Sequence, residues 1–298
     1  MKPVLSLAQL IDRNAAATPD AAALIAGEIR WTWQSLLDDA RQLAAQIPAA
    51  TTPYACQGSS LDLALTACAC SIRQRPFWPL DQPLAQLPPA PEAAALIIST
   101  SGSEGQAKAV ALSNANLVSA ALAANQRLPL GSGDIWLACL PLYHIGGQAI
   151  LWRCAQAGAT VLLHEGFDAS AIAADFQRYP VTHISLVPAM LARLLEMAIK
   201  PPSSLRHAII GGAALSLTLY EKASAAGWPL NPSFGMSESS AQIATWTAAD
   251  GSWQPGLVGT ALGENEISID STGRIRLRGP QIMLGYLGQN ERHKDEWF

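Results

Sequence analysis

Residues 94–112 read AALIISTSGSEGQAKAVAL and contain the segment from which the fold is predicted. An apolar strand is predicted over 94–99 and a second short strand over 109–112, with hydroxyl, glycine and lysine residues between them. Glycines let the backbone turn sharply and approach a ligand closely. Backbone N–H groups and small hydroxyls in such a turn converge on an anion, and Lys108 supplies charge for a polyphosphate. This order favours a phosphate-binding loop over an ordinary Ser/Gly surface turn.

The loop differs from a Walker A loop, which needs Gly-Lys followed by Ser or Thr. Here Lys108 follows Ala107 and precedes Ala109. A P-loop kinase is therefore disfavoured.

Strand and helix patterns alternate on the C-terminal side of residue 93. This rhythm predicts an α/β fold of layered, parallel-rich sheets with flanking helices. We expect a layered α/β core over 1–250 and a small β-rich subdomain over 251–298, while the proline-rich stretch 76–91 is expected to be a connection. Strands are predicted at 94–99, 135–139, 159–163, 182–187 and 207–210, and helices at 5–17, 116–127, 169–176, 189–199 and 216–225.

The composition excludes several classes of protein. The formal net charge is −4 and no long basic run occurs, so nucleic acid is not an expected partner and a small molecule is. Five cysteines in a chain of this length predict no disulfide framework, and Cys68 and Cys70 are expected to be buried thiols. No apolar stretch approaches the ~20 residues that span a bilayer. A reducing cytoplasm is the expected location, and the sequence leaves the oligomeric state open.

The loop resembles the signature loop of the adenylate-forming superfamily, which includes acyl-CoA synthetases, luciferases and peptide-synthetase adenylation domains. Glu104 stands where threonine is usual and Ala107 where proline is usual. Because a carboxylate facing a triphosphate would repel it, Glu104 is expected to point to solvent. The resemblance implies that ATP phosphates contact Thr100, Ser101, Gly102, Ser103, Gly105 and Lys108.

Further segments match this superfamily in the same order: PLYH at 141–144, IGGA at 210–213, FGMSE at 234–238 and the stretch 276–287, which is expected to be mostly architectural. The resemblance implies that Glu238 helps to hold Mg²⁺ and that Ser237 contacts phosphate. It places Gly211, Gly212, Ala213, Phe234 and Gly235 beside adenine. The residues with expected catalytic roles are Lys108, His144, Ser237 and Glu238.

An acid pocket is expected beside the nucleotide, because strands of an open α/β sheet bring their carboxyl ends to a common edge. The expected pocket residues are Tyr143, His144, Gly146, Gly147, Ser185, Val187, Met236 and Ala241. The walls are largely apolar and contain no acid to pair with an ammonium group. This favours an aryl or acyl acid over a free amino acid. No basic residue is assigned to a second carboxylate.

The resemblance implies ATP-dependent activation of a carboxylic acid as an adenylate, followed by thioester formation with coenzyme A. The segments around 144–153, 185–188 and 211–214 look most like o-succinylbenzoate–CoA ligases of menaquinone synthesis. Two alternatives stay open. One is an aryl acid ligase that loads coenzyme A or an acyl carrier protein, and the other is a non-catalytic nucleotide-binding module.

Superfamily members continue past a Trp-Phe segment into a ribose-binding Thr-Gly-Asp motif, a hinge and a domain with a catalytic lysine. Since this sequence stops at Trp297-Phe298, those parts are expected to be absent from it.

Overall fold

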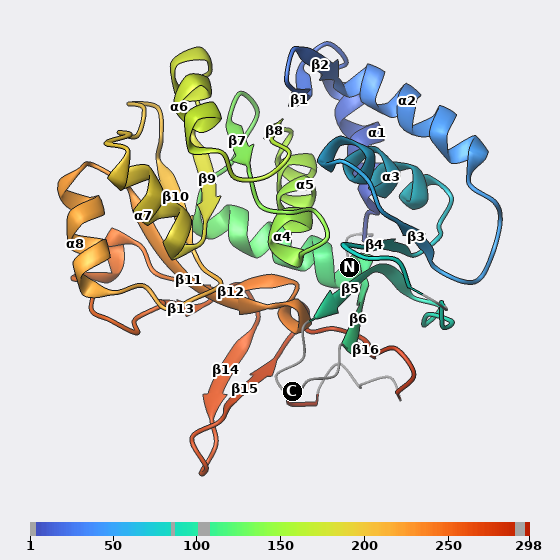
Figure 1. Ribbon diagram of the computed structural model, residues 1–298. Helices are drawn as coiled ribbons and strands as arrows, with labels where there is room; N and C mark the ends of the chain where they lie inside the picture. The colour runs from blue at the N-terminus through green and yellow to red at the C-terminus, as the bar shows by residue number, and fades with distance from the viewer. Residues whose placement is uncertain (1–3, 85–86, 101–107, 290–295) are drawn as a thin grey trace.

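The computed structural model describes residues 4–84, 87–100, 108–289 and 296–298 (Figure 1). Its helices are α1 (Leu7–Ala17), α2 (Trp33–Gln46), α3 (Ser60–Ile72), α4 (Asn114–Arg127), α5 (Ile145–Ala157), α6 (Ala169–Arg178), α7 (Pro188–Glu196) and α8 (Leu217–Ala225), with 3-10 turns η1 (Ser237–Ser239) and η2 (Ala248–Asp250). Its strands are β1 (Ala22–Ala26), β2 (Ile29–Thr32), β3 (Tyr54–Cys56), β4 (Phe77–Pro79), β5 (Ala94–Thr100), β6 (Lys108–Ser113), β7 (Ile135–Ala138), β8 (Thr160–Leu163), β9 (His183–Leu186), β10 (His207–Ile210), β11 (Leu230–Met236), β12 (Ala241–Thr245), β13 (Thr260–Ala261), β14 (Glu266–Ile269), β15 (Ile275–Arg278) and β16 (Gly285–Tyr286).

Side-chain oxygens define where most of these helices begin. Each capping side chain accepts a hydrogen bond from a backbone N–H of the first turn, which would otherwise lack a partner. The capping residues are Ser6, Thr32, Ser59, Ser113, Asp168 and Ser216.

A large sheet has the strand order β13-β12-β11-β10-β9-β7-β8-β1-β2. Its central strands, from β11 to β1, pair in parallel, and β2, β12 and β13 add antiparallel edges. Every residue of β8 and of β9 is buried, as expected for parallel strands that are covered on both faces. The predicted parallel-rich layers are therefore confirmed.

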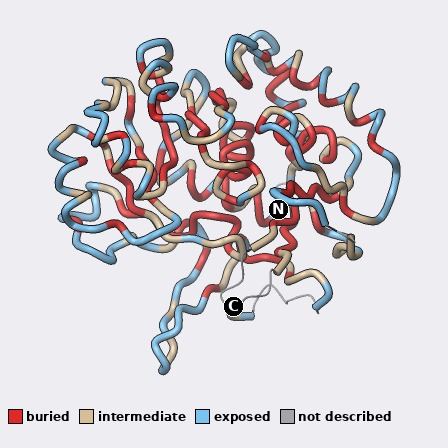
Figure 2. Tube along the Cα trace, viewed as in Figure 1, coloured by how far each residue is buried: buried red, intermediate tan, exposed pale blue. Residues whose placement is uncertain are grey.

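Helices cover the two faces of this sheet in separate groups. Alternate residues of a strand point to opposite faces, so Trp136 packs in the cluster with α1–α5 while its neighbour Leu137 packs in the cluster with α6–α8. In Figure 1, α6, α7 and α8 lie apart from α4 and α5, with strands of the sheet between them. Figure 2 shows the buried segments concentrated in this central region.

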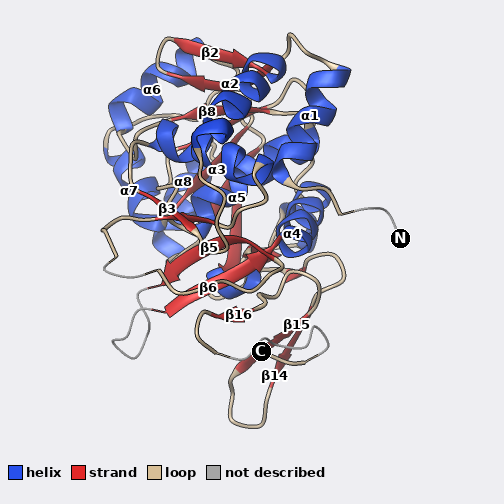
Figure 3. Cartoon of the chain, turned by 90° about the vertical axis from the view of Figure 1, so that its right-hand side faces the viewer, coloured by secondary structure: helices blue, strands red, loops and turns tan. Residues whose placement is uncertain are grey.

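A smaller sheet has the order β16-β6-β5-β4-β3. Strands β5 and β6 pair in antiparallel register, from Ala94 opposite Ser113 to Thr100 opposite Lys108, so the predicted phosphate loop joins the two strands of a hairpin. Figure 3 shows β5, β6 and β16 of this sheet below most of the helices when the molecule is seen from the side. Strand β16 pairs with β6 and places Tyr286 opposite Val110, beside this hairpin.

Most sequence-predicted elements are confirmed, and 207–210 has the predicted bounds as β10. Helices α3 and α5 were missed because they are buried on nearly all sides, which removes the polar/apolar periodicity of a surface helix. The proline-rich stretch 76–91 is not wholly a connection, since Phe77–Pro79 forms β4.

The strands after residue 250 belong to three different sheets. Strand β13 joins the large sheet and β16 the small sheet, while β14 and β15 form a separate hairpin that projects from the body. The boundary between 1–250 and 251–298 stays a prediction.

Cys68 and Cys70 are free, buried thiols, as expected, and burial raises the pKa of each to about 12. In the part of the chain that the structure describes, no helix has the length and apolar character needed to span a membrane.

Leu137 tests the central packing of the large sheet, since its side chain is fully buried beside Ile184 and Leu162. We expect Leu137→Ala to lower the free energy of unfolding by about 2–5 kcal/mol, because it removes buried methyl groups and leaves a cavity. Urea unfolding measures the change. Leu122→Ala, at an exposed position of α4, is the control and should cost less than about 1 kcal/mol. Equal effects of the two substitutions would contradict this core assignment.

Candidate functional site

A cavity of about 430 Å³ lies at the carboxyl ends of β7, β9, β10 and β11. The order of the large sheet reverses here, since the chain passes from β7 to β8 on one side of β7 and then to β9 on the other. Ligands of open α/β sheets bind at such a point, because the loops that leave the strands diverge there. The cavity therefore lies where the fold itself predicts a ligand site.

Separate segments of the chain bring their predicted residues to this cavity. Those that line it are His144, Gly146, Ser185, Val187, Gly211, Gly212, Gly235, Met236 and Ala241. Tyr143, Gly147, Ala213, Phe234, Ser237 and Glu238 do not belong to its lining. The remaining walls are mainly apolar, from residues that include Leu140, Ile145, Met190 and Ile209.

His144 lies at the rim of the cavity, directly before α5. The ring of Tyr143 meets it edge to face, with ring centroids 4.7 Å apart. Partial burial lowers the pKa of His144 below its ordinary value, and the Asp81 carboxylate opposes that shift. The imidazole is therefore mostly uncharged at neutral pH and adds no fixed positive charge to the rim.

Two predicted residues outside the lining are explained by packing. A side chain at Gly147 would place its Cβ 2.4 Å from the backbone oxygen of Pro141, so only glycine fits where α5 crosses this loop. Phe234 packs with Ile243 and Leu277 rather than into the cavity. Ala213 is exposed after β10.

Lys108, Tyr286 and Glu238 form a connected group beside this cavity. The phenol of Tyr286 donates a hydrogen bond of 2.8 Å to Glu238 Oε1, and Lys108 Nζ lies 5.1 Å from the centroid of the same ring. The backbone oxygen of Glu238 also accepts a 2.8 Å hydrogen bond from Met283 N. The segment 276–287, which is expected to be mostly architectural, thus places Tyr286 in contact with both Lys108 and Glu238.

Thr100 and Lys108 flank the predicted phosphate loop, and Thr100 Oγ1 donates a 3.2 Å hydrogen bond to the Lys108 backbone oxygen. Ser237 begins η1, next to Glu238, and is partly buried. Ser101, Gly102, Ser103 and Gly105 lie outside the described residues, and so do the departures at Glu104 and Ala107.

The donor set suits magnesium better than a transition metal. No group of three or more His, Cys, Asp or Glu side chains is placed to hold a metal ion within the described ranges. Mg²⁺ usually takes one or two carboxylates together with waters and substrate phosphates. A single carboxylate, Glu238, close to the predicted phosphate lysine fits that pattern.

Arg153 is a functional candidate that the sequence patterns did not single out. It lines the cavity from α5, two helical turns after Gly146, and is only 3% exposed. Its Nε has no hydrogen-bond partner, and no ion pair between described residues includes it. Desolvation lowers its pKa to about 10, so the side chain stays charged at neutral pH. The sequence signal was a lone arginine within the apolar stretch 149–155.

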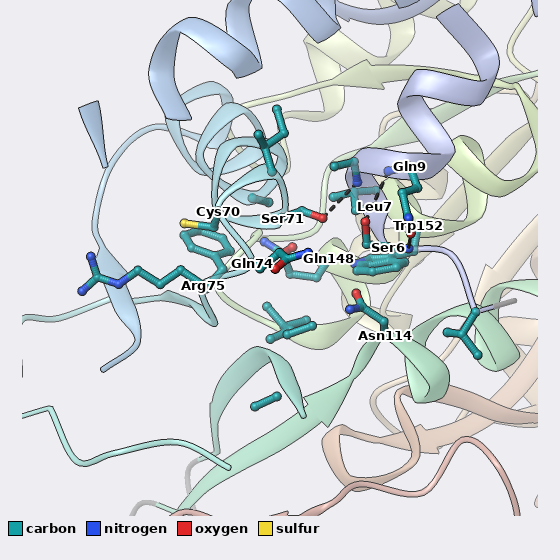
Figure 4. A pocket seen from close by; sticks show the side chains of 18 of the residues that line it. Ser6, Leu7, Gln9, Cys70, Ser71, Gln74, Arg75, Asn114, Gln148 and Trp152 are labelled. Carbon is teal, nitrogen blue, oxygen red and sulfur yellow. Dashed lines mark hydrogen bonds between the residues drawn. The ribbon is translucent and has the colours of Figure 1, made fainter. Parts of the chain in front are cut away.

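A second hollow, of about 490 Å³, lies on the other side of α5, between α1, α3 and the starts of β5 and α4 (Figure 4). Its lining includes Ser71, Gln74, Asn114 and Gln148 but none of the residues that the sequence assigned to a site.

A mainly apolar cavity at the switch point of a parallel sheet, beside the two strands that flank the predicted phosphate loop, is the arrangement expected of an α/β protein that binds a small molecule. The family follows from comparison with known proteins. Residues 57–287 match the AMP-binding enzyme family, and the chain belongs to that family. The resemblance seen in the sequence motifs is confirmed.

Curated relatives carry a specific name. A 2-succinylbenzoate–CoA ligase from Bacillus licheniformis is 34% identical over 218 residues, which are 69% of this chain and 46% of the relative. The protein of the same name from Bacillus subtilis is 32% identical over 212 residues, 68% of this chain and 44% of the relative. The chain thus spans about half the length of the curated relatives that it matches.

Solved structures share the fold. The o-succinylbenzoate CoA synthetase from Bacillus subtilis in complex with the acyl-adenylate intermediate OSB-AMP has a TM-score of 0.84 at 24% identity, over 94% of this chain and 71% of that one. The same enzyme in complex with ATP and magnesium ion has a TM-score of 0.81 at 25% identity, over 94% and 72% of the two chains. The predicted fold class is confirmed.

Gly235 tests the close packing of β11 against β12 at the edge of the cavity. A Cβ there would lie 1.9 Å from the backbone oxygen of Ala241, so the two strands must separate. We expect Gly235→Ala to lower the free energy of unfolding by about 1–3 kcal/mol. Gly131→Ala is the control, because nothing lies within 4 Å of its added Cβ. Urea unfolding should show a change below about 1 kcal/mol for that control, and a Gly235→Ala protein as stable as the control would refute the close approach.

Proposed function

We propose that this protein uses ATP to activate a carboxylic acid as its adenylate and then passes the acyl group to coenzyme A. We propose further that the acid is an aromatic dicarboxylate of the 2-succinylbenzoate type. The names of the curated relatives support the reaction class. The observation that carries the choice of acid is the buried Arg153, which forms no ion pair with any described residue and lies in the wall of a mainly apolar cavity.

A buried guanidinium without an anion is costly, because desolvation is not repaid by Coulomb attraction. A ligand carboxylate would repay it, and it can accept two parallel hydrogen bonds from the planar guanidinium. The carboxylate that reacts must face the α-phosphate of ATP. The partner of Arg153 is therefore a second carboxylate, and 2-succinylbenzoate carries two such groups.

The rest of the lining fits the body of such an acid. Apolar side chains such as Val187, Met190 and Ile209 suit an aromatic ring. Among the described residues no Asp or Glu belongs to the lining, so these residues offer the ammonium group of an amino acid no buried counter-charge. These features favour an aryl acid over a free amino acid.

The nucleotide is assigned to the group next to the cavity. Lys108 and the hydroxyl–glycine loop would bind the β- and γ-phosphates, and Ser237 would contact phosphate. Gly211, Gly212, Ala213, Gly235 and Phe234 would lie beside adenine. Glu238 would hold Mg²⁺ together with phosphate oxygens, and the ion would offset charge on the departing pyrophosphate.

In the proposed first step, a carboxylate oxygen of the acid attacks the α-phosphorus of ATP, and the bond to pyrophosphate breaks. In the second, the thiol sulfur of coenzyme A attacks the acyl carbon, and AMP leaves. The residues of this chain supply position and charge rather than a covalent intermediate. The apolar walls exclude water from the reactive adenylate, and Tyr143 with the uncharged His144 would gate the mouth of the cavity.

We propose coenzyme A rather than an acyl carrier protein as the acceptor, because the relatives are named as coenzyme A ligases. Acid-dependent release of pyrophosphate from Mg·ATP tests the proposal on the protein as its gene encodes it. The assay compares 2-succinylbenzoate with benzoate, a fatty acid and an amino acid. Preference for 2-succinylbenzoate supports the proposal, preference for benzoate points to a simple aryl acid ligase, and no release with any acid points to a non-catalytic nucleotide-binding module.

Lys108→Ala tests the phosphate assignment. We expect the dissociation constant of ATP to rise by about 10- to 150-fold, which corresponds to loss of one charge-assisted contact of about 1.5–3 kcal/mol. Isothermal titration of ATP measures this. Lys200→Ala, at an exposed lysine after α7, is the matched control and should leave ATP affinity unchanged. Unchanged affinity in both variants would remove Lys108 from the phosphate site.

Arg153→Met tests the assignment of the second carboxylate, since methionine keeps an unbranched buried side chain and removes the charge. We expect the dissociation constant of 2-succinylbenzoate to rise by at least about 30-fold, because loss of one partner of a buried charge pair costs about 2–5 kcal/mol. Benzoate binding should change by less than about threefold. Arg193→Met, at an exposed arginine of α7, is the control. An equal loss for both acids would argue against pairing with a second carboxylate.

A further inference from the structure

Three aromatic side chains form a ladder across neighbouring strands of the large sheet. Trp136 on β7 is paired in register with His183 on β9, and His183 with His207 on β10. The rings of Trp136 and His183 stack with centroids 5.0 Å apart and an interplanar angle of 26°, and the centroids of His183 and His207 are also 5.0 Å apart. The site described above assigns no role to this ladder.

The ladder lies on the sheet face that carries the cavity. Side chains two residues apart on a strand point to the same face. Ser185 and Ile209, two residues beyond His183 and His207, both line the cavity. Trp136 therefore lies on the cavity face, one side-chain layer nearer the amino ends of the strands.

Trp136 contacts two of the polar residues that line the cavity, Ser185 and Arg153. Its indole Nε1 donates a hydrogen bond of 3.3 Å to Ser185 Oγ. Its ring also contacts the guanidinium of Arg153, with Cζ 5.4 Å from the ring centroid. One buried side chain thus orients a hydroxyl and a cation in the wall of the same cavity.

The direction of the Ser185 hydrogen bond matters for recognition. Because the indole N–H can only donate, it occupies a lone pair of the Ser185 oxygen and leaves the hydroxyl hydrogen available for an acceptor. The contact of the Arg153 guanidinium with the Trp136 ring is not a hydrogen bond to an acceptor atom, and no hydrogen bond from this guanidinium to a described residue is seen, so its N–H groups stay available for a ligand. Both groups are therefore prepared to donate to a carboxylate.

The remaining members of the ladder keep Trp136 in place without adding charge. Thr182 Oγ1 lies 2.9 Å from His183 Nδ1, and Asn231 Oδ1 lies 3.0 Å from His207 Nδ1. Burial, with a smaller contribution from His207, lowers the pKa of His183 to about 3. An uncharged imidazole stacked on Trp136 does not compete with Arg153 for the indole face.

We infer that Trp136 is a positioning residue for acid specificity: it holds the Arg153 guanidinium and the Ser185 hydroxyl as a two-part donor site for the second carboxylate of the substrate. This inference rests on the proposed function, because it presupposes an acid with two carboxylates. Its effect is on the preference for dicarboxylate over monocarboxylate, not on the binding of an aromatic acid as such.

Isothermal titration measures the dissociation constants of 2-succinylbenzoate and benzoate for this chain. The preference for the dicarboxylate is the dissociation constant of benzoate divided by that of 2-succinylbenzoate. Trp136→Phe keeps an aromatic face but loses the N–H group and should lower the preference by about three- to tenfold. Trp136→Leu loses both contacts and should lower it by about tenfold or more, while benzoate binding changes by less than about threefold.

A double-substitution cycle separates positioning from general support of the fold. Once Arg153→Met has removed the cation, adding Trp136→Leu should lower the preference less than it does alone, because the Trp136–Arg153 contact is already lost and only the hydrogen bond to Ser185 remains to be removed. Ser185→Ala and Trp136→Phe should each lower the preference by a similar factor, and the double variant should lower it no further than either single variant. If Trp136→Leu is too unstable to measure, this second pair decides the matter.

The possible outcomes separate the two proposals. Equal weakening of both acids by the Trp136 substitutions, or fully additive losses in the cycles, would overturn the positioning role. A preference that disappears in Arg153→Met but persists in the Trp136 variants would overturn this inference alone. A preference that persists in Arg153→Met would overturn the dicarboxylate assignment and, with it, the inference.

Discussion

Parallel pairing of β7 with both β8 and β9 is the constraint on which the other features depend. A strand that pairs with its successor on one side and with the next strand on the other forces the two connections onto opposite faces of the sheet. Helix α5 therefore lies on the face that holds the cavity, and α6 on the other. The same reversal separates the loops at the carboxyl ends of the strands and leaves room for a ligand there.

The site combines close packing, which stabilises the fold, with a buried charge, which destabilises it. Close packing at Gly147 and Gly235 fixes the backbone that surrounds the cavity. Arg153 acts in the opposite sense, because a cation with no counter-charge among the described residues lies in the wall of a mainly apolar cavity. A protein optimised for stability alone would place an aliphatic residue there. The charge is therefore best understood as preorganised for an anion that arrives with the ligand.

Sequence reasoning predicted what depends on local pattern and missed what depends on tertiary packing. Strands β5, β6 and β10 follow from apolar runs, which are local, whereas the antiparallel pairing of β5 with β6 emerges only from the structure. Helix α5 was missed because burial on all sides erases its periodicity, and Arg153 was missed with it, since only the fold reveals that an arginine is buried and unpaired. Tyr286 was assigned to architecture because its contact with Glu238 joins residues 48 positions apart in the chain.

The Tyr286–Glu238 hydrogen bond also ties the two sheets together, since Tyr286 belongs to β16 of the small sheet and Glu238 follows β11 of the large one. A ligand that binds Glu238 Oε1 competes with this phenol for the same oxygen. Its binding free energy then includes the work of releasing one tie between the sheets. Linkage is reciprocal. If ligand binding at Glu238 favours a shift of the small sheet against the large one, that shift raises the affinity of Glu238 for the ligand by the same factor. The affinity of Glu238 for a ligand and the position of the small sheet against the large one are therefore coupled through the Tyr286 phenol, which acts beside the Met283–Glu238 backbone hydrogen bond.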